Sequence, residues 1–188
     1  SDRFKANKIT ALAGFARLHA GRVVKIKGSD GNTTELKATN VIIATGSIPI
    51  ELPFAKFDGE RIVDNEGALD FSEVPKRLGV IGAGVIGLEL GSVWRRLGSD
   101  VTVLEALPSF LGACDESIAK EAWKVFTKEQ ELNIKLGVKI EKVTQKKTAI
   151  TLDYTDDKGL AQKLECDKLI VSIGRVPNTE GLGASNVG

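Results

Sequence analysis

The sequence has 188 residues, and its 26 Lys and Arg residues nearly balance its 25 Asp and Glu residues, which gives a formal net charge of +1. This balance argues against nucleic acid or an anionic membrane surface as the main partner. Apolar residues make up 42% of the chain and charged residues 27%, ordinary values for a globular protein that disfavour intrinsic disorder. The length allows one domain, or one domain and part of a second.

Cysteine and histidine are scarce. The chain has two cysteines, Cys114 and Cys166, far apart in the sequence, and a single histidine, His19. This pattern disfavours a disulfide scaffold, a zinc ribbon and an internal dithiol redox centre. Structural or incidental roles are favoured for both cysteines, and His19 is interpreted as a surface turn residue. No apolar stretch approaches the ~20 residues of a membrane helix, so we expect a water-soluble chain.

The strongest motif is a glycine-rich turn between a predicted strand and a predicted helix. Apolar residues 78–81 lead into Gly82-x-Gly84-x-x-Gly87, and residues 100–105 form a second predicted strand that ends in an acid. Between them, the apolar positions that fall on one helical face are Ile86, Leu90, Val93, Trp94 and Leu97. The order strand, helix, strand over about thirty residues is typical of a dinucleotide-binding unit.

The pattern downstream of this unit completes a domain. Asp115 is the predicted N-cap of a second helix, and residues 133–136 form a third strand. Residues 139–166 are predicted to form an antiparallel meander around the turn at 156–159, and residues 168–173 a buried strand. The predicted fold class is therefore α/β, a Rossmann-like domain with a parallel sheet and an antiparallel β-meander.

An internal repeat suggests a second domain of the same type. At a spacing of 128, residues 36, 41–43, 46 and 49 correspond to residues 164, 169–171, 174 and 177. Each copy reads as a meander, a buried strand, a glycine and a proline. Only the second copy has a complete glycine motif ahead of its meander. We therefore expect a truncated remnant of a second dinucleotide-binding domain, with Val41–Ile43 as its buried strand.

The residues of the glycine motif suit a pyrophosphate. Gly82 allows the tight turn, Gly84 lets backbone amides approach the ligand, and Gly87 lets the helix pack on the sheet. Glu105 is placed to bind both hydroxyls of a ribose and to repel a 2′-phosphate, which favours NAD over NADP. No Arg or Lys lies between Glu105 and Lys120 to bind that phosphate.

Two further features stay open on the residues alone. Glu89 could contact a nicotinamide amide or a partner lysine, or could be an exposed helix acid. The segment Ala44-Thr-Gly-Ser47 could approach a ligand at the end of a strand, although a tight loop at a domain boundary is the simpler interpretation.

Several segments resemble one family. Residues 80–98, 44–47, 67–69, 118–121 and 173–178 are similar to the flavoprotein pyridine nucleotide-disulfide oxidoreductases, and among them to the dihydrolipoamide dehydrogenases. The resemblance runs over essentially the whole chain but covers less than half of the length of such enzymes. It implies a partial FAD-binding domain at residues 1–48, an NAD-binding domain at 49–178, and the start of the return to the FAD domain at 179–188.

The same resemblance implies site residues. Those implied for NAD are Gly82, Ala83, Gly84, Val85, Ile86, Gly87, Leu88, Glu89, Glu105, Ile140 and Gly174. Those implied for FAD, and interpreted as vestigial here, are Gly14, Thr45, Gly46 and Ser47. One departure is Glu131, where relatives have a glycine that ends the second helix, and it puts that helix cap in doubt.

The resemblance also implies a function for the intact protein. Enzymes of this kind oxidise dihydrolipoyl groups through a redox disulfide and FAD to reduce NAD, as homodimers within 2-oxo acid dehydrogenase complexes of the cytoplasm or, in eukaryotes, the mitochondrial matrix. The redox cysteine pair, the later FAD motif and the catalytic His–Glu pair are not in this sequence. We therefore expect NAD binding without catalysis, with no catalytic residue, no metal, no nucleic acid and no membrane.

Other functions remain as alternatives. The chain could be the pyridine-nucleotide domain of a mercuric reductase, an NADH oxidase or a glutathione reductase, and Glu105 argues against the NADP-dependent members. Thioredoxin reductase is disfavoured, because that family carries a CxxC pair in its NADP domain and this sequence has none. A non-catalytic nucleotide-binding module is the alternative from a different class.

Overall fold

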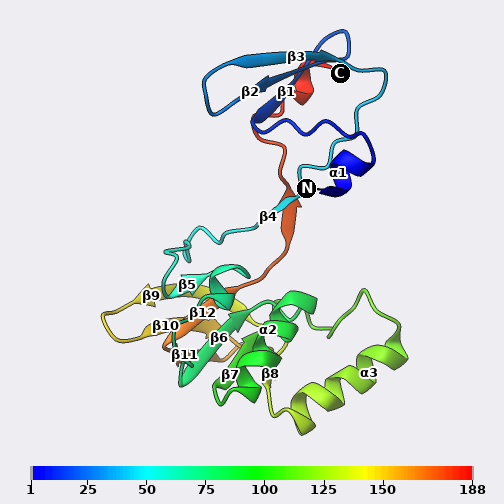
Figure 1. The fold of residues 1–188 in the computed structure, drawn as a ribbon. Coiled ribbons are helices and arrows are strands. Elements are labelled where there is room, and N and C mark those ends of the chain that lie inside the picture. Colours follow the sequence, from blue (N-terminus) through cyan, green and yellow to red (C-terminus); the bar gives the residue numbers. More distant parts are fainter. Residues whose placement is uncertain (1, 188) are drawn as a thin grey trace. The chain divides into compact units, whose positions relative to one another are not determined.

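The computed structural model describes residues 2–187, which divide into two compact units (Figure 1). Unit 1 comprises Ser1–Ile48 and Pro177–Gly188, and unit 2 comprises Pro49–Val176. The chain crosses between the units in β4 (Ser47–Pro49) and again in β13 (Arg175–Pro177). The ends of the predicted segments 1–48 and 179–188 include residues 1 and 188, which lie outside the described residues.

Unit 1 is built around a three-stranded antiparallel sheet. Its elements are α1 (Asp2–Ala6), β1 (Phe15–His19), β2 (Val23–Lys27), β3 (Thr33–Lys37) and η3 (Ala184–Asn186). In the sheet, Leu18 of β1 pairs with Val24 of β2, which in turn pairs with Leu36 of β3. Leu18 is buried, and its amide donates to the Leu182 carbonyl at 2.8 Å. The meander predicted from the first repeat copy is confirmed.

The buried strand predicted at Val41–Ile43 is wrong. These residues form no strand, and Ile42 is 91% exposed. The physical reason is that a parallel strand needs neighbouring strands to accept and donate its backbone hydrogen bonds. It also needs other elements that cover both of its faces. No strand within residues 2–187 pairs with this segment, although its repeat partner, β12, has a neighbour on each side.

Unit 1 therefore exposes large apolar side chains, and we expect it to drive self-association of the chain. Phe15 is 89% exposed, and Ile42 is 91% exposed. Apolar surface of this kind promotes association in water. Light scattering at rising concentration should show particles larger than a monomer, and the variant Phe15→Lys/Ile42→Lys should reduce them. A wild-type chain that stays monomeric at high concentration would contradict this expectation.

Unit 2 contains a five-stranded parallel sheet with the order β5-β12-β6-β7-β8. Its strands are β5 (Ile62–Val63), β12 (Lys168–Val171), β6 (Arg77–Ile81), β7 (Asp100–Leu104) and β8 (Asn133–Lys135). The βαβαβ order expected from the sequence is confirmed. The edge strand β5 was not anticipated, because two residues are too short a run to show a strand pattern.

Helix α2 (Val85–Arg96) packs on one face of the parallel sheet. Its Leu88, Leu90 and Trp94 join a core with Val80 and Val103 of the sheet. The predicted apolar face is wrong in part, because Val93 is 36% and Leu97 56% exposed. Gly87 and Gly91 lie on the sheet side instead. A Cβ on Gly87 would clash with the glycine loop, and a Cβ on Gly91 would be in van der Waals contact with Leu132 and Val101.

Tryptophan and phenylalanine side chains extend this core. The indole Nε1 of Trp94 donates to the Ala68 carbonyl in η1 (Gly67–Leu69) at 3.1 Å. Trp123 packs edge-on against Phe110. Both tryptophans thus pack inside unit 2.

An antiparallel sheet covers the other face of the parallel sheet. It is formed by β9 (Lys139–Gln145), β10 (Ile150–Thr155) and β11 (Ala161–Cys166), in the order β11-β10-β9. Its Ile150 and Leu152 are fully buried against Leu104 and Leu169. Cys166 lies in the same core, where burial raises its thiol pKa to about 12. That cysteine is therefore a packing residue and an unreactive thiol at neutral pH.

The second helix of the unit, α3 (Glu116–Lys124), begins as predicted and ends in an unusual way. The Asp115 carboxylate accepts from the Ser117 amide at 2.9 Å, which confirms the N-cap. A π-helical turn, η2 (Val125–Glu129), follows. Glu131 has a φ of +53°, the left-handed conformation that a glycine would adopt more readily, and its carboxylate pairs with Arg95.

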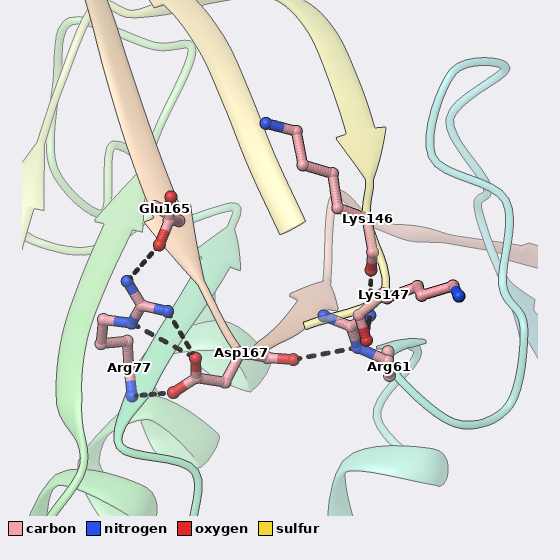
Figure 2. A network of polar contacts seen from close by, with 6 residues as sticks. All are labelled: Arg61, Arg77, Lys146, Lys147, Glu165 and Asp167. Carbon is pink, nitrogen blue, oxygen red and sulfur yellow. Dashed lines mark hydrogen bonds and ion pairs between the residues drawn. The ribbon is translucent and has the colours of Figure 1, made fainter. Parts of the chain in front are cut away.

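A polar network joins the two sheets at one end of the unit (Figure 2). Arg77 donates to Asp167 through its backbone amide, Nε and Nη2, and to Glu165 through Nη1. Arg61 donates to the carbonyls of Asp167, Lys146 and Lys147. The network thus links β6 and the segment before β5 to the β9–β10 turn and to the residue between β11 and β12.

We expect Asp167→Asn to destabilise the chain in a pH-dependent way. Partial burial alone would raise the pKa of Asp167, but hydrogen bonds from Arg77 outweigh it and lower that pKa in the folded state. A carboxyl group whose pKa is lower in the folded chain stabilises the fold at pH values above its unfolded pKa of about 4. This stabilisation is lost as the pH falls through the folded-state pKa. The variant should lose about 1–2 kcal/mol of unfolding free energy at pH 7, after allowance for partial exposure.

Urea denaturation at pH 7 and pH 3 measures this difference. The gap between wild type and Asp167→Asn should narrow at pH 3, and Glu165→Gln, which removes a more exposed partner of Arg77, should have a smaller effect. An equal gap at both pH values would contradict the assignment of this effect to the Asp167 charge.

Candidate functional site

A cavity of about 730 Å³ opens at the carboxyl ends of three neighbouring strands of unit 2. Its walls include Ile81 and Gly82 after β6, Leu104 and Glu105 after β7, and Ser172 after β12. The chain leaves β6 toward β7 on one side, whereas β12 lies on the other side of β6. Such a switch point of an open α/β sheet is where ligands bind in this architecture.

The three glycines of the motif have different surroundings. Gly82 has a φ of +102°, and a Cβ there would lie 2.5 Å from the Ser172 carbonyl oxygen. A Cβ on Gly87 would lie 2.1 Å from the Gly82 carbonyl oxygen. A Cβ on Gly84 would meet no atom within 4 Å, and Gly84 lines the cavity. Gly82 and Gly87 are thus required by the fold, whereas Gly84 leaves open space beside the loop.

Helix α2 presents an uncapped N-terminus to the cavity. Its N-cap is Gly84, which has no side chain, so no side-chain hydrogen bond caps the first amides. Val85 and Ile86 of the first turn line the cavity. The first amides of a helix have no intrahelical acceptor and carry the positive end of the helix dipole. With the open space at Gly84, this arrangement fits a phosphate or pyrophosphate group.

The Glu105 carboxylate is held beside the glycine loop. Its Oε2 accepts from the Ala83 amide at 2.6 Å, and its Oε1 accepts from the Leu107 amide at 2.8 Å. These two hydrogen bonds fix a negative charge on the wall of the cavity, next to the loop. A fixed carboxylate at this place can accept from ribose hydroxyls and disfavours an additional phosphate.

The start of β9 lies beside the loop that follows β7 and lines the cavity with it. The Val138 amide donates to the Glu105 carbonyl at 3.0 Å, and the Gly137 amide donates to the Leu107 carbonyl at 3.0 Å. Lys139 and Ile140 follow and line the cavity. Ile140 was predicted here from the family resemblance. Lys139 was not predicted, because it is distant from Glu105 in the sequence and only the backbone hydrogen bonds of the fold bring its segment there.

The far end of the cavity contains polar residues that the sequence analysis missed. Arg175 Nη1 donates to Asn65 Oδ1 at 2.7 Å, and both residues line the cavity. Gly174 lies beside them with a φ of +127°, and its carbonyl accepts from the Ile50 amide at 3.1 Å. No sequence motif surrounds Asn65, so only the fold could bring it to this site.

The structure brings most of the predicted NAD residues together. Those that line the cavity are Gly82, Gly84, Val85, Ile86, Glu105, Ile140 and Gly174. The other predicted residues do not line it. Ala83 contributes its amide to Glu105, Gly87 packs against the loop, Leu88 is buried in the core, and Glu89 is exposed on α2.

The residues predicted for FAD do not line the cavity of unit 1. Unit 1 has its own cavity of about 540 Å³, lined by residues such as Leu18, His19 and Val41, but not by Gly14, Thr45, Gly46 or Ser47. A Cβ on Gly14 would lie 2.5 Å from the Lys27 carbonyl oxygen, which explains that glycine by packing alone. His19 is half-buried at the end of β1, which corrects its interpretation as a surface turn residue.

Two features are absent from the described residues. Within residues 2–187, no group of three or more His, Cys, Asp or Glu side chains lies close enough together to hold a metal ion. No helix in the same range is both long and apolar enough to cross a membrane.

Comparison with known sequences gives a consistent result. The sequence profile of the pyridine nucleotide-disulphide oxidoreductases matches residues 2–188. Over 98% of its length, the chain is 57% identical to the dihydrolipoyl dehydrogenase of Cupriavidus necator and 45% identical to dihydrolipoyl dehydrogenase 3 of Pseudomonas putida. It is 44% identical to the mitochondrial dihydrolipoyl dehydrogenase of Caenorhabditis elegans. The chain spans 37–40% of the length of these three relatives.

Solved structures agree with the sequences. The chain aligns over its whole length with 41% of LpdA from Mycobacterium tuberculosis, with a TM-score of 0.86 and 28% identity. Over 99% of its length it also aligns with 43% of a cysteine-to-serine mutant of the flavoprotein disulfide reductase RclA from Escherichia coli, with a TM-score of 0.81 and 25% identity. On the profile match over residues 2–188 and these identities, the chain belongs to the pyridine nucleotide-disulphide oxidoreductase family.

Proposed function

We propose that unit 2 binds NAD in the cavity at the carboxyl ends of β6, β7 and β12. The observation that carries this proposal is the convergence of three features on one cavity: the open space at Gly84, the uncapped N-terminus of α2, and the fixed carboxylate of Glu105. Together they match a pyrophosphate followed by a ribose that carries free hydroxyls. The cavity volume is within the range of cofactor sites.

Each part of the cavity has a role in this proposal. The amides at the start of α2 bind the pyrophosphate, Glu105 accepts from the adenosine ribose, and Ile140 contacts the adenine. Gly174 lies where the backbone can approach the other end of the dinucleotide. When bound, NAD supplies a nicotinamide ring that accepts a hydride. This chain's own contribution is to bind and orient the dinucleotide.

The proposal extends to the longer protein that the relatives represent. We infer that it is an NAD-dependent dihydrolipoamide dehydrogenase that also binds FAD, acts on dihydrolipoyl groups, and forms a homodimer within 2-oxo acid dehydrogenase complexes. Its compartment would be the cytoplasm, or the mitochondrial matrix in a eukaryote. The identities of 44–57% to dihydrolipoyl dehydrogenases support this inference. In such a protein unit 2 would hold the final electron acceptor, and unit 1 would belong to the FAD domain.

Calorimetric titration of the chain with NAD, and separately with NADP, tests the binding proposal. We expect saturable binding of one NAD per chain and weaker binding of NADP, because Glu105 repels the 2′-phosphate. AMP, which lacks the second phosphate and the nicotinamide ribose, should bind more weakly than NAD. Failure of NAD to bind would contradict the proposal.

A further inference from the structure

Within residues 2–187, Lys139 and Arg175 are the cationic side chains that line the cavity, and Lys139 comes from a segment that is hydrogen-bonded to the Glu105 segment. The backbone fixes this arrangement, because the amide of Val138, the residue before Lys139, donates to the carbonyl of Glu105. Glu105, Ala106 and Leu107 line the cavity, and so do Lys139 and Ile140 of the neighbouring segment. A carboxylate and a lysine from two hydrogen-bonded segments thus line the same cavity.

The two charges are held very differently. The Glu105 carboxylate is fixed by two backbone amides. Among residues 2–187, the partner of the Lys139 ammonium is Glu141 of its own strand, with Nζ 3.0 Å from Oε1 and 3.3 Å from Oε2. The Lys139 side chain is 78% exposed, and exposed ion pairs of this kind contribute little to stability. The ammonium group can therefore leave Glu141 for a phosphate at small cost, whereas Glu105 stays in place.

We propose that Lys139 is a second specificity-determining residue of the dinucleotide site. It attracts the 2′-phosphate of NADP, against the repulsion from Glu105. In this arrangement the preference for NAD depends on Glu105 alone, and Lys139 weakens it. Once the Glu105 charge is removed, Lys139 makes the site an acceptor of NADP. The proposal rests on the proposed function, since it assumes that the dinucleotide binds with its adenosine ribose at Glu105.

A set of charge-removing variants tests this proposal by calorimetric titration with NAD and NADP at low ionic strength. The variants are Lys139→Gln, Glu105→Gln, the double variant Glu105→Gln/Lys139→Gln, and Lys142→Gln as a control. Lys142 is an exposed lysine of the same strand that does not line the cavity. The quantity compared is the ratio of the NADP and NAD dissociation constants, which cancels any general loss of affinity.

Glu105→Gln should bring NADP affinity close to NAD affinity or above it. In the Glu105→Gln background, Lys139→Gln should then weaken the binding of NADP by about tenfold relative to that of NAD. This is the scale of one charge-assisted phosphate contact. Lys139→Gln alone should also raise the ratio of the NADP to the NAD dissociation constant. Lys142→Gln should change this ratio by less than about twofold.

Two results would overturn the proposal. One is a ratio that Lys139→Gln leaves unchanged in the Glu105→Gln background. The other is an equal change with Lys142→Gln, because the effect would then be a general one of net charge. If the wild-type chain and every variant bind neither dinucleotide, the proposed function itself fails and the role of Lys139 falls with it. If NAD binds but Lys139→Gln leaves the ratio of the two dissociation constants unchanged, only the role of Lys139 is rejected.

Discussion

Gly87→Ala is expected to lower the free energy of unfolding by about 3 kcal/mol. The new methyl group would lie 2.1 Å from the Gly82 carbonyl oxygen and 2.6 Å from Ser172 Oγ. The first of these is a backbone atom of the tight loop, so relief requires α2 to move away from β6. The cavity would be disrupted together with the fold. Urea denaturation measures the loss of stability, and titration with NAD measures the loss of the site.

Gly84→Ala is the matched control, because it adds the same methyl group three residues earlier. Gly84 has a φ of −73° and a ψ of 177°, which alanine adopts without strain, and its Cβ would meet no atom of the chain within 4 Å. Stability should fall by less than about 1 kcal/mol, the scale of an N-cap change. NAD affinity should nevertheless fall by about tenfold or more, because the methyl group occupies the space that a pyrophosphate needs. Similar effects of the two variants on stability would contradict this division of roles.

Glu105→Ala is expected to weaken NAD binding by about tenfold or more and to abolish the preference for NAD over NADP. The variant removes the acceptor of ribose hydroxyls and leaves the Ala83 and Leu107 amides without their carboxylate partner. Losing these hydrogen bonds should also lower the free energy of unfolding by about 1–2 kcal/mol. Calorimetry with both dinucleotides and denaturation by urea measure the two effects.

Glu105→Gln separates the loop contact from the charge. Its amide oxygen can still accept from one of the two backbone amides, so this variant should keep more stability than Glu105→Ala. It should lose the preference for NAD to the same degree, because the negative charge that repels a 2′-phosphate is gone. A Glu105→Gln chain that still prefers NAD as strongly as wild type would contradict the electrostatic role of Glu105.

The features that follow from local sequence could be predicted. The glycine turn between β6 and α2, the Asp115 cap and the strand-ending acid Glu105 each depend on residues close together in the chain. Hydrophobic runs such as Val101–Leu104 are buried on both faces, which makes the parallel strands easy to recognise. These features were sufficient to predict the fold class and the residues at the centre of the cavity.

The features that depend on contacts across the fold could not be predicted. Lys139 and Asn65 reach the cavity only because β9 and the segment after β5 lie beside it. The helical spacing of Val93 and Leu97 resembled that of buried residues, but the glycines of α2 turn another face toward the sheet. Val41–Ile43 has the composition of a buried strand, yet no strand among residues 2–187 pairs with it. In each case the outcome depends on neighbours that are distant in the sequence.

The most direct test of the account is to map the NAD contacts residue by residue. Amide chemical shifts of isotope-labelled chain, recorded by nuclear magnetic resonance during titration with NAD, identify the backbone groups that respond. The account predicts the largest changes at Ala83–Gly87, at Glu105 and Leu107, and at Lys139 and Ile140. Saturable changes that cluster instead on residues of unit 1, such as those around Leu18 and Val41, would contradict it. The absence of any saturable change would contradict it as well.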